Sequence, residues 1–289
     1  MKQFALITNS TIDEDAAYYH DHEVGYAPLQ YTLDGTTYTE DFWQSLSAKE
    51  FYDALREGKM CMTSQTAVET YLKLYREALE RGQDVLYLGF SSGLSGSFQA
   101  GVIAAQDLAP EFPDRRIVCV DSLSVTGGMH ILVDQAIAMR DAGESVDTVA
   151  QRIKLARTHI THLVTPNDLK HLYRGGRLSH SSAIVGSLVG IKPVLYVNEE
   201  GKVGVLTKVR GRVPALQYVA DVMHSEVSDP KQTVWISHGD CLADAELLRD
   251  YIAQKHGMHA EIRMLGTVLG AHGGPGTIIL SYAGGSRTR

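Results

Sequence analysis

Cysteine is scarce in this sequence, and the common nucleotide-binding signature is absent. The 289 residues include three cysteines, at positions 61, 119 and 241, which are widely spaced and odd in number. This pattern excludes a disulfide framework and a Cys-x-x-Cys metal site. No G-x-x-x-x-G-K-[ST] segment occurs, so the chain lacks a P-loop for phosphates. The histidine pairs 159/162 and 256/259 have no HExxH context and no third ligand nearby, so we expect no metal site.

Long apolar runs and an excess of positive charge are also missing. No stretch approaches the roughly 18 apolar residues that a membrane helix needs. The net charge of -7 argues against bulk attraction to nucleic acid. The N-terminal MKQFALITNS leads directly into a strand pattern instead of the apolar core of a signal peptide. We therefore expect a cytoplasmic protein that does not bind nucleic acid.

Strand-like apolar runs alternate with helical patterns through the first half of the chain. FALITNS is followed by a predicted helix at 12–22, VLYLGF by one at 98–109, and RIVCVDS by one at 127–142. This alternation predicts parallel strands covered by helices. Beyond about residue 158, IKPVLYVNEEGKVGVLTKV predicts two strands around a Glu-Gly turn. Such a hairpin requires antiparallel pairing.

The fold class that follows is α/β with two domains. The chain exceeds the usual length of one domain, and its 44% apolar content suffices for a core in each of two. We expect residues 1–158 to form a parallel-sheet α/β domain. Residues 159–283 should form a smaller α+β domain with a mixed or antiparallel sheet, and residues 284–289 a flexible tail.

Three helix starts carry a hydroxyl residue followed three positions later by glutamate. They are Thr11 with Glu14, Ser47 with Glu50, and Thr66 with Glu69. In this arrangement the two side chains can cap each other's backbone N–H groups. We expect a helix to begin at each of them.

Two hydroxyl-rich loops and one glycine-rich loop are the candidate functional elements. SSGLSGS at 91–97 follows a buried strand and precedes a helix, which is where parallel sheets bind ligands. It contains no cation, and a carboxylate needs only hydroxyls and a helix N-terminus. MCMTSQT at 60–66 offers Thr63 and Ser64, and HGGPG at 272–276 offers His272. The alternative is that the hydroxyl residues only bond their own backbone at helix starts.

Seven segments, in this order, resemble the DegV family. They are TNSTID at 8–13, TSQ at 63–65, SSGLSGS at 91–97, VDS at 120–122, DLKHLYRGGRL at 168–178, IKPVL at 191–195 and HGGPGT at 272–277. The resemblance runs from about residue 4 to residue 282. It implies two α/β domains that enclose a long-chain fatty acid, without any cofactor. It also implies a carrier of the FakB type, which presents the lipid to a FakA-like catalytic subunit with a dihydroxyacetone kinase-like ATP domain, and which can contact the membrane transiently.

The resemblance also assigns roles to particular residues. Thr63, Ser95 and His272 would bind the fatty acid carboxylate, and the chain itself would have no catalytic residue. The supporting loop residues would be Ser64, Gly93, Gly96, Ser97, Gly273 and Gly274. The absence of a positive side chain in the loop would keep the carboxylate available to receive a phosphoryl group, whereas a buried arginine would oppose this transfer.

Three positions depart from the family pattern. Asn9 stands where aspartate is usual, Thr66 replaces a common proline, and Arg174 replaces a more typical lysine. Arg174 keeps the positive charge and Thr66 keeps a residue suited to a helix start. Asn9 removes a carboxylate near the end of the first strand, so that position cannot act as a base.

Positive charge is concentrated between residues 154 and 212. The segment holds ten Lys or Arg residues against three acids, whereas the rest of the chain has 17 against 31. A basic face on an acidic protein speeds encounter with an acidic partner and orients it. The docking candidates are Lys170, Arg174, Arg177, Arg210 and Arg212, of which the family motif singles out Arg177. A solvated surface is the alternative interpretation.

A serine acyl hydrolase is the competing function. Ser95 would be the nucleophile, His272 the base, and Asp121 or Asp240 the orienting acid. The sequence around Ser95 is G-L-S-G, which is not the G-x-S-x-G elbow of α/β-hydrolases.

Overall fold

The computed structural model of the protein describes residues 3–178, 190–285 and 287. Its first sheet has four strands in the order β2 (Val24–Ala27), β1 (Phe4–Asn9), β6 (Asp84–Gly89) and β7 (Ile117–Asp121), and every pairing is parallel. This confirms the parallel sheet predicted for the first half. The central strands β1 and β6 are buried on both faces, which explains why they are nearly continuous apolar runs.

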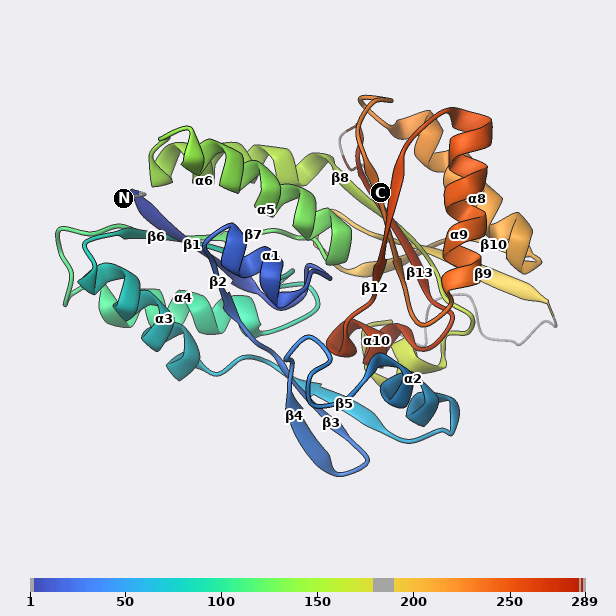
Figure 1. Ribbon diagram of the computed structural model, residues 1–289, viewed down its shortest axis with the longest axis horizontal. Helices are drawn as coiled ribbons and strands as arrows, with labels where there is room; N and C mark the ends of the chain where they lie inside the picture. The colour runs from blue at the N-terminus through green and yellow to red at the C-terminus, as the bar shows by residue number, and fades with distance from the viewer. Residues whose placement is uncertain (1–2, 179–189, 286, 288–289) are drawn as a thin grey trace.

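Helices cover both faces of the parallel sheet (Figure 1). On one face, α3 (Val68–Glu80) and α4 (Ser97–Leu108) pack against the sheet. On the other lie α1 (Ala16–Asp21), α5 (Thr126–Asp141) and α6 (Val146–Ala156). α5 has buried residues nearly all round because it also contacts strands of the second large sheet.

The second large sheet is mixed and contains six strands. Their order is β10 (Val203–Arg210), β9 (Ile191–Val197), β8 (Ile160–Thr165), β13 (Ile278–Ala283), β11 (Val234–His238) and β12 (Ala260–Met264). Only the β11–β12 pairing is parallel, and β9 with β10 forms the predicted antiparallel hairpin. Its outer face is covered by α8 (Arg212–Glu226) and α9 (Leu242–Tyr251), which continues into a π-helical turn at Ile252–His256. The predicted fold class is therefore confirmed.

A third sheet was not predicted. It consists of the short antiparallel strands β4 (Thr36–Thr39), β3 (Gln30–Leu33) and β5 (Cys61–Ser64). The sheet and the helix α2 (Ala48–Arg56) form one unit. Its strands are four residues long and largely polar, so their apolar alternation is weak. This unit packs around α10 (Thr267–Gly273), although the two lie more than 200 residues apart in sequence (Figure 1).

Only one of the three predicted capping pairs is present, although α3 begins only two residues after Thr66. Ser47 and Glu50 form the expected capping box at α2. α1 instead begins after Asp15, whose carboxylate accepts the Tyr18 N–H, and α3 begins after Ala67 without a side-chain cap. Thr11 and Thr66 are both buried and contact other parts of the fold. Tertiary contacts therefore used the hydroxyl groups that local capping would have required.

The two large sheets fall on either side of the predicted boundary at residues 158 and 159, but α5 and α10 each pack on the other half. The domain limits themselves stay a prediction.

In the predicted tail, residues 286 and 288–289 lie outside the described part. Arg287, by contrast, is buried and donates to the carbonyl oxygens of Leu123, Arg157 and Asn198. Among the described residues, no helix combines the length and apolar character needed to cross a bilayer.

Candidate functional site

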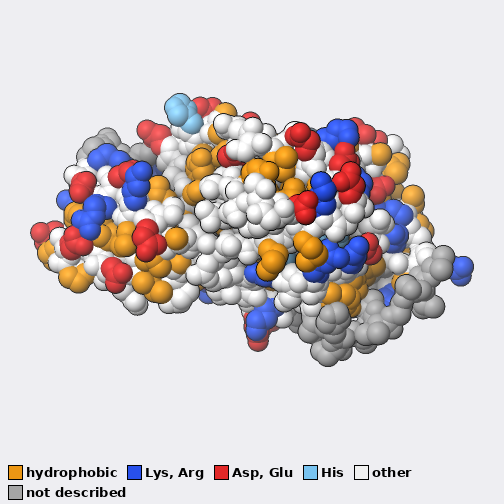
Figure 2. Space-filling model, turned by 90° about the horizontal axis from the view of Figure 1, so that it is seen from below, with side chains coloured by type: hydrophobic (Ala, Val, Ile, Leu, Met, Phe, Trp, Pro, Cys, Tyr) orange, Lys and Arg blue, Asp and Glu red, His pale blue; other side chains and the backbone are white. Residues whose placement is uncertain are grey.

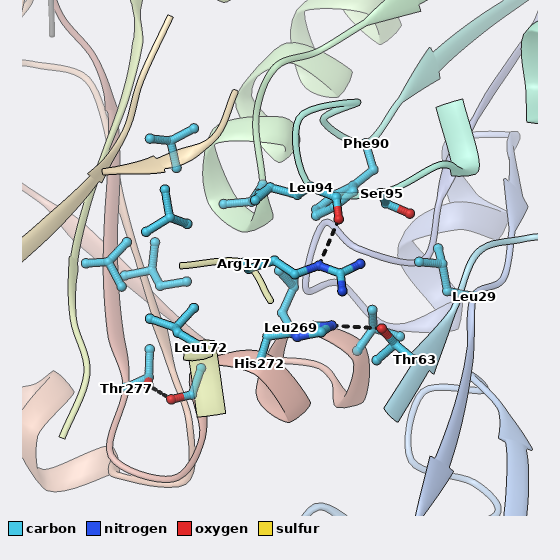
Figure 3. A pocket seen from close by; sticks show the side chains of 17 residues that line it. Leu29, Thr63, Phe90, Leu94, Ser95, Leu172, Arg177, Leu269, His272 and Thr277 are labelled. Carbon is cyan, nitrogen blue, oxygen red and sulfur yellow. Dashed lines mark hydrogen bonds between the residues drawn. The ribbon is translucent and has the colours of Figure 1, made fainter. Parts of the chain in front are cut away.

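A pocket lies where the three sheets meet. It has a volume of about 710 Å³, counting its open mouth, and 17 residues line it (Figure 3). Eleven of these are apolar: Leu29, Phe90, Leu94, Val125, Val164, Leu172, Val197, Val203, Val268, Leu269 and Ile279. A largely apolar lining with a few polar side chains is typical of small-molecule sites.

Most polar side chains of the pocket lie together at one end, whereas Thr277 lies apart from them beside Leu172 (Figure 3). Oγ1 of Thr63, on β5, and Nε2 of His272, on α10, are 2.8 Å apart. Ser95 and Arg177 also line this region, and Figure 3 shows aliphatic side chains extending away on the opposite side. The structure thus brings the three predicted head-group residues to one pocket. Whether they bind a carboxylate stays a prediction.

His272 is a neutral side chain in this pocket. Burial lowers its pKa from 6.5 to about 3, and the positive charge of Arg177 acts in the same direction. Its Nδ1 atom is buried and has no hydrogen-bond partner among the described residues. The imidazole therefore offers hydrogen bonds, not charge, at neutral pH.

Ser95 is held at the start of a helix. The Ser97 N–H donates to Ser95 Oγ, and the two hydroxyl oxygens are 3.0 Å apart. Ser97 is fully buried, and its Oγ also accepts the N–H of Thr66. Gly96 is the N-cap residue of α4. Ser97 and Gly96 therefore shape the loop that presents Ser95.

The predicted supporting residues divide into two groups. Gly93 packs so closely on the β9–β10 turn that a Cβ there would lie 2.5 Å from the Glu200 carbonyl oxygen. Gly274 has a φ of +79° and lies against the His171 ring, and Gly273 lines the pocket. Ser64 is different, because it is exposed and does not line the pocket. Side chains alternate along a strand, so a neighbour of Thr63 on β5 points to the opposite side.

The profile described as "Uncharacterised protein, DegV family" matches residues 3–284. The chain belongs to the DegV family. A DegV domain-containing protein of Clostridium perfringens is 34% identical over 289 residues, and the match covers 99% of each chain. This establishes the family over the whole described fold.

Solved DegV structures have the same architecture. A fatty acid binding DegV-family protein from Streptococcus agalactiae is 31% identical, with a TM-score of 0.86 and coverage of 97% of this chain and 98% of that one. A DegV-family protein from Thermus thermophilus, which also binds fatty acid, is 28% identical, with a TM-score of 0.87 and coverage of 98% and 100%.

Arg177 of this DegV chain lies in the pocket, where the sequence led us to expect no cation. Its Nε donates to the Leu94 carbonyl at 3.0 Å and its Nη1 to the Gly175 carbonyl at 2.7 Å (Figure 3). Burial lowers its pKa. Within the described part of the chain it forms no ion pair with a carboxylate. The expectation of an uncharged pocket is thus wrong, because the turn after α7 (Lys170–Arg174) folds back against the SSGLSGS loop.

The other docking candidates differ in their exposure. Lys170, Arg174 and Arg210 are exposed. Arg212 is not available in the same way, because its side chain is 17% exposed and pairs with Asp244. Its guanidinium also donates to the carbonyls of Thr165 and Gly276. Arg212 therefore connects β8, α9 and the loop before β13, and we omit it from the docking surface.

The hydrolase triad is not assembled in the described residues. His272 Nε2 faces Thr63, whereas Ser95 Oγ faces Ser97. Asp121 accepts the N–H groups of Ser92 and Leu123. Asp240 pairs with Arg56. This geometry counts against nucleophilic catalysis by Ser95. Likewise, the described ranges contain no group of three His, Cys, Asp or Glu side chains that could hold a metal ion.

Asn9 does not line the pocket but holds Phe90, which does. Its Oδ1 accepts the Phe90 N–H and the Tyr87 hydroxyl, both at 2.9 Å, and its Nδ2 donates to the Tyr71 hydroxyl and the Ala27 carbonyl. These bonds use both the donor and acceptor capacity of an amide, which a carboxylate lacks. These four hydrogen bonds give a structural reason for asparagine instead of aspartate at position 9.

Sequence reasoning missed the apolar walls. Phe90 follows β6 and Val125 is the N-cap residue of α5, and both line the pocket, as does the polar Thr277 just before β13. A signal was available for Thr277, which lies in the HGGPGT segment, and for Leu94, which lies in SSGLSGS. The remaining walls come from β8, β9, β10, β13, α7, α10 and Leu29, and no local pattern distinguishes these residues from ordinary core residues.

Proposed function

We propose that this chain binds a long-chain fatty acid, with its carboxylate at Thr63, Ser95 and His272. The observation that carries the proposal is an apolar pocket that ends in hydrogen-bonding groups beside Arg177, whose described contacts are only with carbonyl oxygens. A single anionic head group on an apolar tail matches both ends of this pocket. Fatty acid binding by the Streptococcus agalactiae and Thermus thermophilus proteins supports this choice.

The tail supplies most of the binding free energy. Burying a sixteen-carbon chain contributes on the order of 12 kcal/mol before association costs, at about 0.8 kcal/mol per CH₂ group. Each hydrogen bond to the carboxylate adds about 1.5–3 kcal/mol. The apolar walls therefore set affinity, and the polar end fixes which end of the lipid lies near the SSGLSGS loop.

Arg177 gives the pocket an electrostatic preference for an anion. Its side chain is half-buried, so its attraction to a carboxylate is screened less than at the surface. Its guanidinium is already oriented by two backbone carbonyls. We propose that Arg177 stabilises the bound carboxylate. This proposal replaces two expectations from the sequence, namely that the head-group site holds no cation and that Arg177 serves partner docking.

We further propose that the loaded protein presents the carboxylate to a separate fatty acid kinase, which phosphorylates it to an acyl phosphate. In this scheme the chain is a carrier and contributes no catalytic residue. Lys170, Arg174 and Arg210 are exposed and offer a basic surface for the kinase subunit. Figure 2 shows several Lys and Arg side chains close together on the underside of the half that holds the six-stranded sheet, with acidic side chains among them.

Mass spectrometry of a denaturing organic extract of the purified protein tests lipid binding. We expect a stoichiometric fatty acid, whose mass reports the preferred chain directly. A protein that is empty and also fails to take up added oleate or palmitate would contradict the proposal. Charge reversal of Lys170, Arg174 and Arg210 to Glu then tests docking: lipid uptake should be retained while kinase-dependent acyl phosphate formation falls.

A further inference from the structure

The helix α10 supplies much of the proposed lipid pocket. Val268, Leu269, His272 and Gly273 all belong to it and all line the pocket. By sequence α10 lies in the second half of the chain, but it contacts α2, β3 and β5 of the first half as well as α7. It has seven residues, and so short a helix has little stability of its own. Its position must therefore be fixed by its surroundings.

The N-terminus of α10 has no cap from its own segment. Its N-cap residue is Gly266, which provides no side chain. The Gly266 N–H donates to Oδ1 of Asp13 at 3.2 Å, and the Thr267 N–H donates to Oε2 of Glu40 at 3.1 Å. The Thr267 hydroxyl donates to the same oxygen of Glu40. Two carboxylates from distant loops thus satisfy the backbone groups that a helix start leaves unpaired.

Both carboxylates are buried, so each needs hydrogen-bond partners within the protein. Glu40 is 4% exposed, and the second oxygen of Asp13 is buried without a hydrogen-bond partner among the described residues. Asp13 also has a φ of +59°, a conformation that costs energy for a residue with a side chain. Burying a carboxylate is unfavourable unless its oxygens are bonded. The bonds to α10 therefore offset part of this cost, together with bonds from Ser237 to Asp13 and from the Phe42 backbone to Glu40.

We propose that Asp13 and Glu40 are positioning residues that hold α10, and through it His272, in the lipid pocket. The expected effect on lipid retention rests on the proposed fatty acid binding, whereas the contacts of Asp13 and Glu40 with α10 do not depend on it. The hydroxyl of Tyr52 donates to the Leu265 carbonyl at 2.7 Å and supports the same segment from α2. Neither carboxylate lines the pocket, so each acts on the lipid only through the helix.

The test compares Glu40→Ala with Glu40→Gln and with a matched control, Asp41→Ala. Asp41 is the neighbouring acid and bonds Gln44 and Ser45 of its own loop. Hydrogen exchange of residues 267–273 is measured in lipid-free protein, with strand β6 as internal reference, and oleate dissociation is measured in loaded protein. Loss of a capping side chain corresponds to about a tenfold change. We expect Glu40→Ala to speed both exchange and oleate release by about that factor.

Rescue separates positioning from general stability. Glu40→Gln keeps an acceptor oxygen and should recover most of the protection of residues 267–273 and most of the oleate retention, whereas Asp41→Ala should match the wild type throughout. If Glu40→Ala does not fold, Thr267→Val removes only the hydroxyl bond and should give a smaller change in the same direction. If Glu40→Ala shows the same hydrogen exchange and the same oleate release as Asp41→Ala, the proposal is wrong. If the wild type takes up no oleate, the proposed function fails, and lipid-free exchange still decides whether the carboxylates hold α10.

Discussion

Thr63 and His272 are separated by 209 positions in the sequence, and yet Oγ1 of Thr63 lies 2.8 Å from Nε2 of His272. One belongs to the edge strand β5 of the small sheet and the other to α10. Their contact closes the polar end of the pocket and joins the two halves of the chain there. The predictions below follow from this arrangement.

Removing two hydroxyls at the polar end should weaken lipid binding without unfolding the protein. In Thr63→Val with Ser95→Ala, two hydrogen bonds to the carboxylate are lost, at about 1.5 kcal/mol or more each, so oleate affinity should fall roughly 100-fold or more. Calorimetric titration with oleate measures the change. Ser64→Ala is the control, because Ser64 is exposed beside Thr63 and does not line the pocket. Unchanged affinity in the double variant would remove both hydroxyls from the head-group assignment.

The protonation of His272 should report lipid binding. Burial and Arg177 keep its pKa at about 3 in the lipid-free protein. A carboxylate bound nearby adds a negative charge, which favours the protonated form, so the pKa of His272 should rise on loading. Titration of the ring signals by NMR, with and without oleate, checks this. The signals of His259, which pairs with Glu261 at the surface, should not respond to oleate. A pKa of His272 that is equal in both states would place the carboxylate elsewhere.

Charge at Arg177 should matter only for ligands that carry charge. Arg177→Gln should lower oleate affinity roughly 10- to 100-fold, the equivalent of one hydrogen bond to a charged group, and should leave the affinity for oleyl alcohol nearly unchanged. Arg174→Gln is the matched control, since Arg174 lies three positions away in sequence, is exposed and does not line the pocket. Equal losses for the acid and the alcohol would mean that Arg177 contributes by packing alone.

Asp13 should make the protein less stable as the pH rises. The pKa of Asp13 is raised from 3.8 to about 7, mainly by burial. The charges of Glu40 and Glu14 act in the same direction, and hydrogen bonds from Ser237 and Gly266 oppose the shift. The folded state therefore binds the proton more tightly than the unfolded state. Its contribution to stability is complete below pH 3.8 and is lost as the pH rises through 7, with a slope of at most about 1.4 kcal/mol per pH unit.

Asp13→Asn removes this titrating group. Between pH 4 and pH 7, urea unfolding should show the wild type losing stability relative to the variant. If the free energy of unfolding changes with pH equally in the wild type and in Asp13→Asn, Asp13 does not titrate in this range.

Much of the fold could be predicted from local patterns. The parallel strands β1, β6 and β7 are continuous apolar runs followed by helical periodicity, and the β9–β10 hairpin has a recognisable turn. Helix starts were less reliable, because Thr11 and Thr66 have the right residue type and spacing but are used in tertiary contacts. The same hydroxyl group can cap a helix or bond a distant segment, and only the folded chain decides which.

The candidate site was predictable only in part. Thr63, Ser95 and His272 stand in glycine- and hydroxyl-rich loops next to strand or helix ends, and such loops are visible in a sequence. Arg177 was interpreted as a surface cation because its segment is basic, and nothing local shows that its guanidinium turns inward to the Leu94 carbonyl.

By itself, the sequence determined most strands and helices of the two large sheets, the family, and the loops that carry the polar residues, because these depend on periodicity and on short motifs. The tertiary structure alone decided that the small sheet encloses α10, that Asp13 and Glu40 meet its N-terminus, and that Arg177 enters the pocket. These contacts join residues more than 80 positions apart. They depend on how whole elements pack against one another, which hydrophobic periodicity within a single segment does not specify.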